Sequence, residues 1–345
     1  MHSYISSSNK PYNAGSWLVI WLVSFVLAGG VLIAAEFFFR VRGHLPSVID
    51  DELLWACHRH RIYDAGKKKP VVILGASRVL LGFVPGVFEQ HFPEYRIVQL
   101  AVGGAHPFAA LRDLANDERF NGIVIVSITL ASLSRSNRED QQPYVDFYHD
   151  TFLSGCYRDD EFNRSVSTFF QKNTVVTNHE LRWDNIAMNL IRNRSFPARN
   201  YYVTHSDRSR SADYEKIDVA AHRRERIQKL QEGYERQNRI APEVWLNQAM
   251  EVEPFVRAIQ RRGGKVVFVR YITTGEHYEL DEKYYPKSKY WDQFAKKTEA
   301  VTIHFKDVPE LSNFECPDTS HLDFRDAPRF TVSLGHELRR LGVIR

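Results

Sequence analysis

Short apolar runs alternate with amphipathic stretches in two parts of this chain, and this alternation predicts the fold. The apolar runs have the length of β-strands and lie at residues 71–77, 95–102, 122–130, 265–272 and 300–307. Stretches with apolar residues at helical spacing lie between or after them, at residues 106–118, 242–264, 284–298 and 327–342. Strands that alternate with helices pair in parallel and carry helices on both faces. We therefore predict an α/β fold: an open, mostly parallel sheet of about five strands in a flavodoxin-like three-layer sandwich.

Residues from 131 to about 240 interrupt this alternation. Polar and aromatic residues dominate there, and segments such as 181–193 have helical spacing. We interpret the region as a largely helical insertion that caps the edge of the sheet. Within it, the stretch 220–239 is rich in basic residues interrupted by acids, which is typical of a solvated helix face.

The amino-terminal part has a different pattern. No charged residue occurs from Trp17 to Ala35, which is long enough to cross the hydrocarbon core of a bilayer as a helix. We prefer an uncleaved anchor to a cleavable signal peptide, because a signal peptide has a shorter apolar region and a more basic start than the single Lys10. The predicted organisation is a tail at 1–16, a transmembrane anchor at 17–39, a connector at 40–69 and a domain at 70–345 that contains the insertion.

Composition and charge narrow the classes of function. Of 345 residues, 43% are hydrophobic and 26% are charged, as in a soluble domain and unlike a polytopic membrane protein. The net charge of +4 is small, which argues against nucleic acid as a partner. Cys57, Cys156 and Cys316 are too few and too scattered for a disulfide framework or a CxxC metal site. We place the sequence CHRH at 57–60 on the surface, and we predict no metal or organic cofactor.

Candidate catalytic residues lie beyond the carboxyl ends of the predicted strands, where the active sites of open α/β sheets are found. Ser77 follows the first strand, Gly103 and Gly104 follow the second, and Asp318 and His321 precede the last helix. A serine hydroxyl needs a base to act as a nucleophile, and a carboxylate can orient a histidine that accepts the proton. Each signal has an ordinary explanation by itself, since a serine after a strand is commonly a helix cap. Their order along the chain favours a Ser–His–Asp triad with a backbone oxyanion hole.

Two blocks of sequence resemble those of a known family. The residues ILGASR at 73–78 resemble the Gly-x-Ser block of the SGNH (GDSL-like) hydrolases, and PDTSHLDFRDAPRFT at 317–331 resembles their Asp-x-Ser-His-Leu block. The likeness is greater to membrane-anchored members, the alginate O-acetylation proteins and the D-alanyl transfer protein of teichoic acids. It covers roughly residues 70–130 and 240–345, and the insertion carries almost none of it.

The resemblance implies roles for individual residues. Ser77 would be the nucleophile, His321 the base and Asp318 its orienting acid, while the backbone of Ser77, Gly104 and Gly103 would form the oxyanion hole. One block departs from the family: SITLASLSR at 127–135 replaces Gly-x-Asn-Asp, so Thr129 or Ser132 would have to supply the side-chain donor. The residues expected to hold an anionic or sugar group are Arg78 and Arg270, for which salt bridges on the surface are the alternative.

The implied function is a membrane-anchored serine esterase or O-acyltransferase. It would act on O-acyl groups, acetyl above all, of an envelope or extracellular polysaccharide, and a transferase would depend on a membrane-bound acyl donor protein. The alternative is a non-catalytic anchored scaffold that binds glycan or such a partner. The near-even basic flanks of the apolar run leave its orientation open, and the resemblance implies an inward amino terminus with a periplasmic or extracellular body. A nucleotide-binding α/β protein is disfavoured, because no glycine-rich phosphate loop is present.

Overall fold

The computed structural model describes residues 14–64, 66, 68–130, 133, 138–155, 158–193, 196, 199–236 and 240–345. The chain divides into two compact units. One contains residues 1–46 and 173–199, and the other contains residues 47–172 and 200–345. Ser132 and Cys156 lie outside the described residues.

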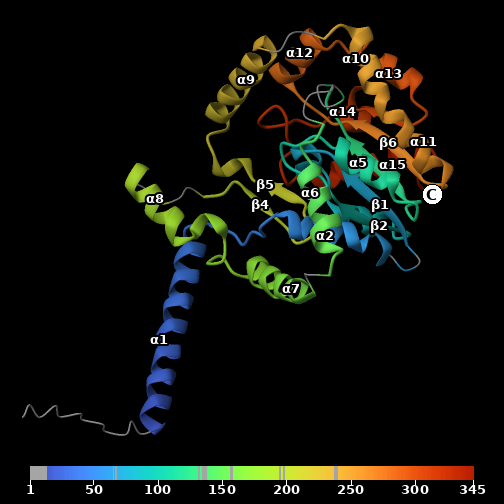
Figure 1. Cartoon of the computed structure of the whole chain (residues 1–345). Coiled ribbons are helices and arrows are strands. Elements are labelled where there is room, and N and C mark those ends of the chain that lie inside the picture. Colours follow the sequence, from blue (N-terminus) through green and yellow to red (C-terminus); the bar gives the residue numbers. More distant parts are fainter. Residues whose placement is uncertain are drawn as a thin grey trace, which may run out of the picture. The chain divides into compact units, whose positions relative to one another are not determined.

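A five-stranded parallel sheet forms the centre of the larger unit (Figure 1). Its order is β2-β1-β3-β6-β7, and every neighbouring pair is parallel. The strands are β1 Lys69–Leu74, β2 Tyr95–Gln99, β3 Ile123–Ser127, β6 Lys265–Arg270 and β7 Val301–His304. β2, β3, β6 and β7 each fall within one of the apolar runs of the sequence, and β1 overlaps the run at 71–77 but begins two residues before it. The predicted α/β sheet is therefore confirmed.

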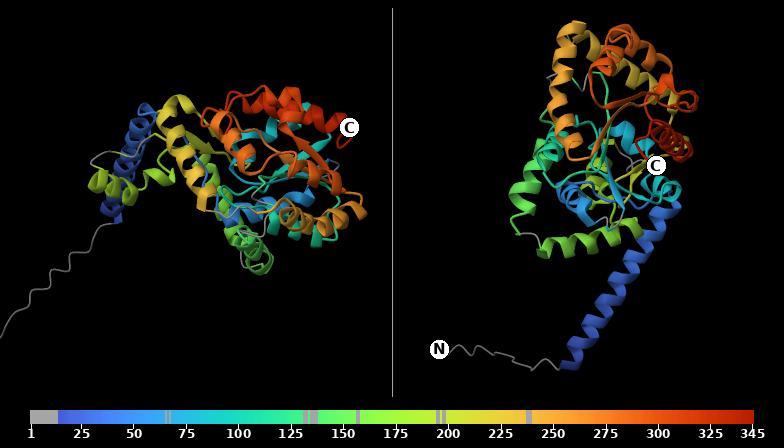
Figure 2. Two further views of the ribbon diagram at one scale, coloured as in Figure 1. Left: turned by 90° about the horizontal axis from the view of Figure 1, so that it is seen from above. Right: turned by 90° about the vertical axis from the view of Figure 1, so that its right-hand side faces the viewer.

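Helices cover both faces of this sheet, as Figure 2 shows with α15 on one side of the strands and α5 on the other. Alternate residues of β1 enter two different cores: Val72 and Leu74 pack in one, Val71 and Ile73 in the other. A strand buried on both faces reads as a continuous apolar run, which is why these segments show no alternation. The helices of the first face include α2 Glu52–His60, α5 Phe108–Asn116, α10 Pro242–Ala249, α11 Glu253–Arg261 and α13 Trp291–Lys297. Those of the second face include α3 Ser77–Gly82, α4 Pro85–His91, α14 Pro309–Ser312 and α15 Ala327–Arg340.

Two predicted helices are each divided. The stretch 242–264 forms α10 and α11, separated by a 3₁₀ turn at Met250–Val252. Pro254 stands in the first turn of α11, where proline is tolerated, but it cannot donate the bond that would continue α10. The stretch 284–298 likewise contains the end of α12 Gly275–Tyr284, then Pro286, and then α13.

The insertion is largely helical, as predicted, but it also contains a hairpin. Its parts in the larger unit are α6 Gln142–Asp146, a π-helix at Phe147–Phe152, α7 Arg158–Asn173, β4 Tyr202–Thr204, β5 Arg210–Ala212 and α9 Val219–Arg236. The last residue of α7 and all of α8 Trp183–Asn193 belong to the smaller unit. β4 and β5 pair antiparallel over three residues each, too short for the sequence pattern to indicate a strand.

The prediction that CHRH lies on the surface is wrong. Cys57, His58 and Arg59 are buried on α2. Arg59 donates to Asp113 and Asp117, at 2.6 and 2.8 Å. These carboxylates, which lie on α5 and at its end, compensate the buried charge. Because Asp113 and Asp117 are far from Arg59 in the sequence, no local sequence pattern indicates that Arg59 is buried.

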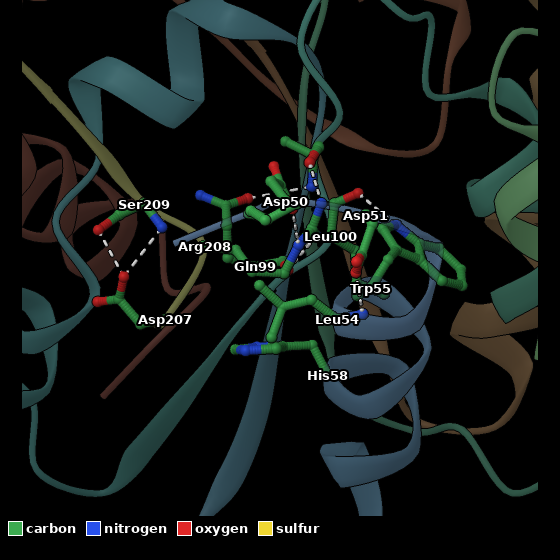
Figure 3. A network of polar contacts seen from close by, with 12 residues as sticks. Asp50, Asp51, Leu54, Trp55, His58, Gln99, Leu100, Asp207, Arg208 and Ser209 are labelled. Carbon is green, nitrogen blue, oxygen red and sulfur yellow. Dashed lines mark hydrogen bonds and ion pairs between the residues drawn. The ribbon is translucent and has the colours of Figure 1, made fainter. Parts of the chain in front are cut away.

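Arg208 joins the insertion to the sheet (Figure 3). Its side chain is fully buried; it donates to Asp50 Oδ1 at 2.7 Å and to the carbonyls of Gln99 and Ala101 at 2.8 and 3.1 Å. The two carbonyls lie at the end of β2, immediately before the Gly103–Gly104 loop. Arg208 therefore fixes the chain where that loop begins.

We expect Arg208→Met to lower the free energy of unfolding by about 3–5 kcal/mol, because the buried Asp50 carboxylate then loses one of its two arginine partners. Urea unfolding of the full chain in detergent measures this loss. The matched control is Arg210→Met, since Arg210 contacts the other Asp50 oxygen at 3.1 Å but is partly exposed. Equal losses for the two variants would contradict the role given to Arg208.

The smaller unit contains α1 Ala14–Val41. Its part from Trp17 to Val41 has a mean hydropathy of 2.6 and exposes its apolar side chains. By length and composition it is able to span a bilayer.

Candidate active site

Ser77 lies at a sharp turn between β1 and α3. At Gly75, where φ is +143°, an added Cβ would lie 2.7 Å from the Cβ of Ser127 on the neighbouring strand, so only glycine fits. Ala76 is the N-cap of α3 and Ser77 its first residue, so the serine is not the cap. The Ser77 hydroxyl instead lies 2.8 Å from His321 Nε2. Ser77 is therefore not a helix cap, and its hydroxyl is directed to His321.

His321 and Asp318 come from one tight turn before α15. His321 Nδ1 lies 2.8 Å from Asp318 Oδ2, while Asp318 Oδ1 accepts the backbone N–H groups of Ser320 and His321 at 2.9 and 2.7 Å. Between them Thr319 has φ +71°, a costly conformation for a β-branched residue. Its carbonyl accepts from Thr274 N at 2.9 Å, and its N–H donates to Cys316 O at 2.8 Å, which hold it in place. The turn is thus fixed on both sides of the aspartate.

Burial and neighbouring charges set the protonation of this pair. Burial raises the pKa of Asp318, but the hydrogen bond and charge of His321 and the charge of Arg226 outweigh it and hold the pKa well below its usual range. Burial lowers the pKa of His321 below 6.5; Asp318 opposes this, and Arg226 and Arg78 reinforce it. At neutral pH the aspartate is charged and the imidazole neutral, so Nδ1–H donates to Asp318 and Nε2 accepts from Ser77.

A pH profile tests this electrostatic setting. A base must be neutral to accept a proton, so an enzyme that used His321 as its base would lose activity when the pH drops through the pKa of His321. Because that pKa is lowered, we expect the acid limb of kcat/KM below pH 6.5. Arg226→Gln removes a charge that disfavours protonation and should move the limb to higher pH. Arg223→Gln is the control, since Arg223 lies on the same helix and donates to Pro317 O instead; an equal shift in both variants would refute the explanation.

The glycines predicted for the oxyanion hole lie in the loop after β2. Gly104 has φ +76° and lines a cavity together with Thr129 and Arg78. At Gly103 an added Cβ would lie 2.8 Å from Arg210 Nη1. Of the two proposed side-chain donors, Thr129 is therefore at the cavity, and Ser132 lies outside the described residues.

This cavity has a volume of about 470 Å³ and a basic lining. Arg78, Arg226, Lys229 and Arg270 line it together with one carboxylate, Asp281. Ser77 and His321 do not line it themselves. It adjoins them through Arg78, whose Nε donates to Ser320 Oγ at 3.1 Å, and through Arg226, which lies 3.6 Å from Asp318.

Arg78 and Arg270 have different partners. Arg270 is buried and pairs with Asp281, so its salt bridge is internal and not on the surface. Arg78 Nη2 lies 2.8 Å from His277 Nε2, and its buried Nη1 has no hydrogen-bond partner among the described residues. Burial lowers the pKa of His277 to about 3, so the neutral ring accepts from Arg78. Burial also lowers the pKa of Arg78 to about 10, and the guanidinium stays charged at neutral pH.

Sequence reasoning missed the contribution of α9, which it assigned to a solvated face. His222 and Arg226 lie 3.9 and 3.6 Å from Asp318, and Tyr234 donates to Asp281 at 2.5 Å. The spacing of residues 222, 226, 230 and 233 along one helix face was the available signal, but many acids and bases on the other faces obscured it.

Comparisons with known proteins add little to this geometry. No family model and no curated protein matches the sequence. Among solved structures, a crystal structure of TesA is similar, with a TM-score of 0.34 and 10% identity over 79% of this chain and 99% of that one. The likeness is distant, and the α/β fold is established by the strand order and pairing of the chain itself.

Proposed function

We propose that this protein is a membrane-anchored serine esterase or O-acyltransferase that forms an acyl-Ser77 intermediate. The observation that carries the proposal is the chain of two 2.8 Å contacts from Ser77 through His321 to Asp318. A hydroxyl within hydrogen-bond reach of an oriented, neutral imidazole is the arrangement that nucleophilic catalysis by serine needs.

In the first half-reaction, Ser77 Oγ attacks the acyl carbonyl carbon while His321 Nε2 takes the hydroxyl proton. Asp318 stabilises the resulting imidazolium. The oxyanion would be held by the backbone N–H of Ser77 and of Gly104, with Gly103 beside it. When the carbon–oxygen bond to the leaving alcohol breaks, His321 returns the proton to that alcohol, which leaves an ester on Ser77.

In the second half-reaction, His321 takes a proton from water or from a sugar hydroxyl as that oxygen attacks the acyl carbon. The bond to Ser77 breaks and its oxygen is reprotonated. Water gives hydrolysis, and a sugar hydroxyl gives transfer from a membrane-bound acyl donor. We assign the basic cavity beside Arg78 and Arg270 to the polysaccharide, whose O-acetyl ester would lie at its Ser77 end.

The apolar helix α1 supports a location of this reaction at a membrane. We infer that it anchors the chain in the cytoplasmic membrane with its amino terminus inside and the α/β body in the periplasm or outside the cell. An uncleaved α1 keeps the body near a membrane-bound donor, whereas cleavage would release it.

A fluorophosphonate probe tests the catalytic assignment. We expect it to label the full chain in detergent and to fail with Ser77→Ala, while His321→Ala slows labelling strongly. Ser312→Ala is the matched control, because this serine lies at the end of α14 and donates to Pro309 O. If the folded wild-type protein still binds glycan but is not labelled, the proposal of an enzyme is refuted. The alternative, a non-catalytic anchored scaffold, is then supported.

A further inference from the structure

Helix α8 carries an exposed apolar face. The apolar residues occupy the i, i+3, i+4, i+7 and i+8 positions that form one side of a helix: Trp183, Ile186, Ala187, Leu190 and Ile191. Trp183 and Ile191 expose 81% and 78% of their surface. Asn185, Asn189 and Arg192 lie on the other side. A soluble helix normally buries such a face, so the exposure calls for a medium or partner that covers it.

The segment before α8 is bonded to the last turns of α1. The backbone N–H groups of Val175 and Val176 donate to the Glu36 carboxylate at 2.8–3.0 Å. Arg40 Nη2 donates to Asn173 O at 2.8 Å. These bonds place the chain that enters α8 beside the end of α1.

The segment after α8 returns to the same turns. The ring of Phe196 packs against Phe38, with centroids 6.2 Å apart, and Arg42 lies 4.2 and 4.7 Å from the centroids of these two rings. Both flanks of α8 are thus attached to the last turns of α1 and to Arg42, which follows it, and Figure 1 shows α8 beside that end of α1.

This attachment sets the depth of α8. At 1.5 Å per residue, the charge-free stretch before Glu36 accounts for about 30 Å, the thickness of a hydrocarbon core. Glu36 and the residues bonded to it therefore lie at the membrane surface if α1 spans the bilayer. An amphipathic helix with an exposed tryptophan is suited to that level.

We propose that α8 lies in the headgroup region of the bilayer that α1 crosses, with Trp183 and Ile191 directed towards the acyl chains. This inference rests on the membrane anchor proposed above. It gives the insertion a role: α8 is a second contact with the lipid surface, at the level where α1 leaves the hydrocarbon core. A second copy of the chain or another protein over the same face is the competing occupant, and the test separates it from lipid.

The test uses the full chain in vesicles of phosphatidylethanolamine and phosphatidylglycerol, with Cys156 replaced by serine; Cys57 and Cys316 are buried. An environment-sensitive fluorophore is attached to Ile191→Cys, to Arg192→Cys on the polar side, and to Val26→Cys within α1. Two kinds of quencher are used. The first is a nitroxide group attached to a lipid, at a shallow or a deep position, and the second is a water-soluble ion that quenches the fluorophore. We expect shallow lipid nitroxides to quench the fluorophore at 191 several-fold more than that at 192, which the aqueous ion should quench instead.

The position 26 fluorophore separates the two proposals. Deep quenching at 26 with equal aqueous quenching at 191 and 192 overturns the inference about α8 and leaves the anchor standing. Shielding of 191 from both lipid and aqueous quenchers also overturns it, because protein then covers the face. Absence of lipid quenching at 26 overturns the anchor itself and the inference with it.

Discussion

Ser77→Ala and His321→Ala should each lower kcat for ester hydrolysis by about 10⁴- to 10⁶-fold, and the double variant should be little worse than either single one. In the proposed mechanism both residues act in one proton transfer: without the imidazole the hydroxyl is a weak nucleophile, and without the hydroxyl the imidazole has no proton to accept. Hydrolysis of a nitrophenyl acetate and release of acetate from an acetylated polysaccharide provide the measurements.

The controls for this experiment are Ser312→Ala and His336→Ala. His336 is exposed on α15, and Ser312 makes only a local bond at the end of α14. Both should keep wild-type rates. Losses that multiply in the Ser77/His321 double variant would mean that the two side chains act independently, which would refute the shared proton transfer.

The five strands of the parallel sheet could be predicted because they are largely buried on both faces and therefore appear as short apolar runs. Ser77 could be found because it follows one of these strands, and Asp318 and His321 because they precede the last helix. The distance between Ser77 and His321 could not be predicted, since 244 residues separate them and only the packed fold sets it. The same holds for Arg208, whose carbonyl partners at the end of β2 are 107 and 109 residues away.

The insertion shows more clearly what the periodicity of hydrophobic residues cannot predict. Arg226 contacts Asp318 from a helix whose composition is that of a solvated surface, because its other faces are in water. The apolar face of α8 was visible as helical spacing at 181–193. Only the contacts of Glu36 and Phe38 with its flanks indicate that the two ends of α8 are attached near the end of α1.

Asp318→Asn should lower kcat at neutral pH by about 10⁴-fold while the protein stays folded. An asparagine amide retains one oxygen, which can still accept the N–H groups of Ser320 and His321. Its NH₂ group then faces His321 Nδ1 and donates to it, so the proton of the imidazole moves to Nε2. The ring would donate to Ser77 Oγ instead of accepting from it, and the base would be lost.

The matched control is Asp323→Asn. Asp323 is a buried aspartate two residues beyond His321; it accepts from Tyr214 N at 3.1 Å and from Arg325 at 2.9 Å. Among the described residues, no hydrogen bond or ion pair joins Asp323 to the His321 imidazole. We expect Asp323→Asn to change the urea midpoint but to keep kcat near the wild-type value, whereas Asp318→Asn changes kcat far more than stability. If kcat falls equally in both variants, Asp318 only shapes the turn. A loss confined to Asp318→Asn shows that its charge and its acceptor oxygen set the tautomer on which proton transfer from Ser77 depends.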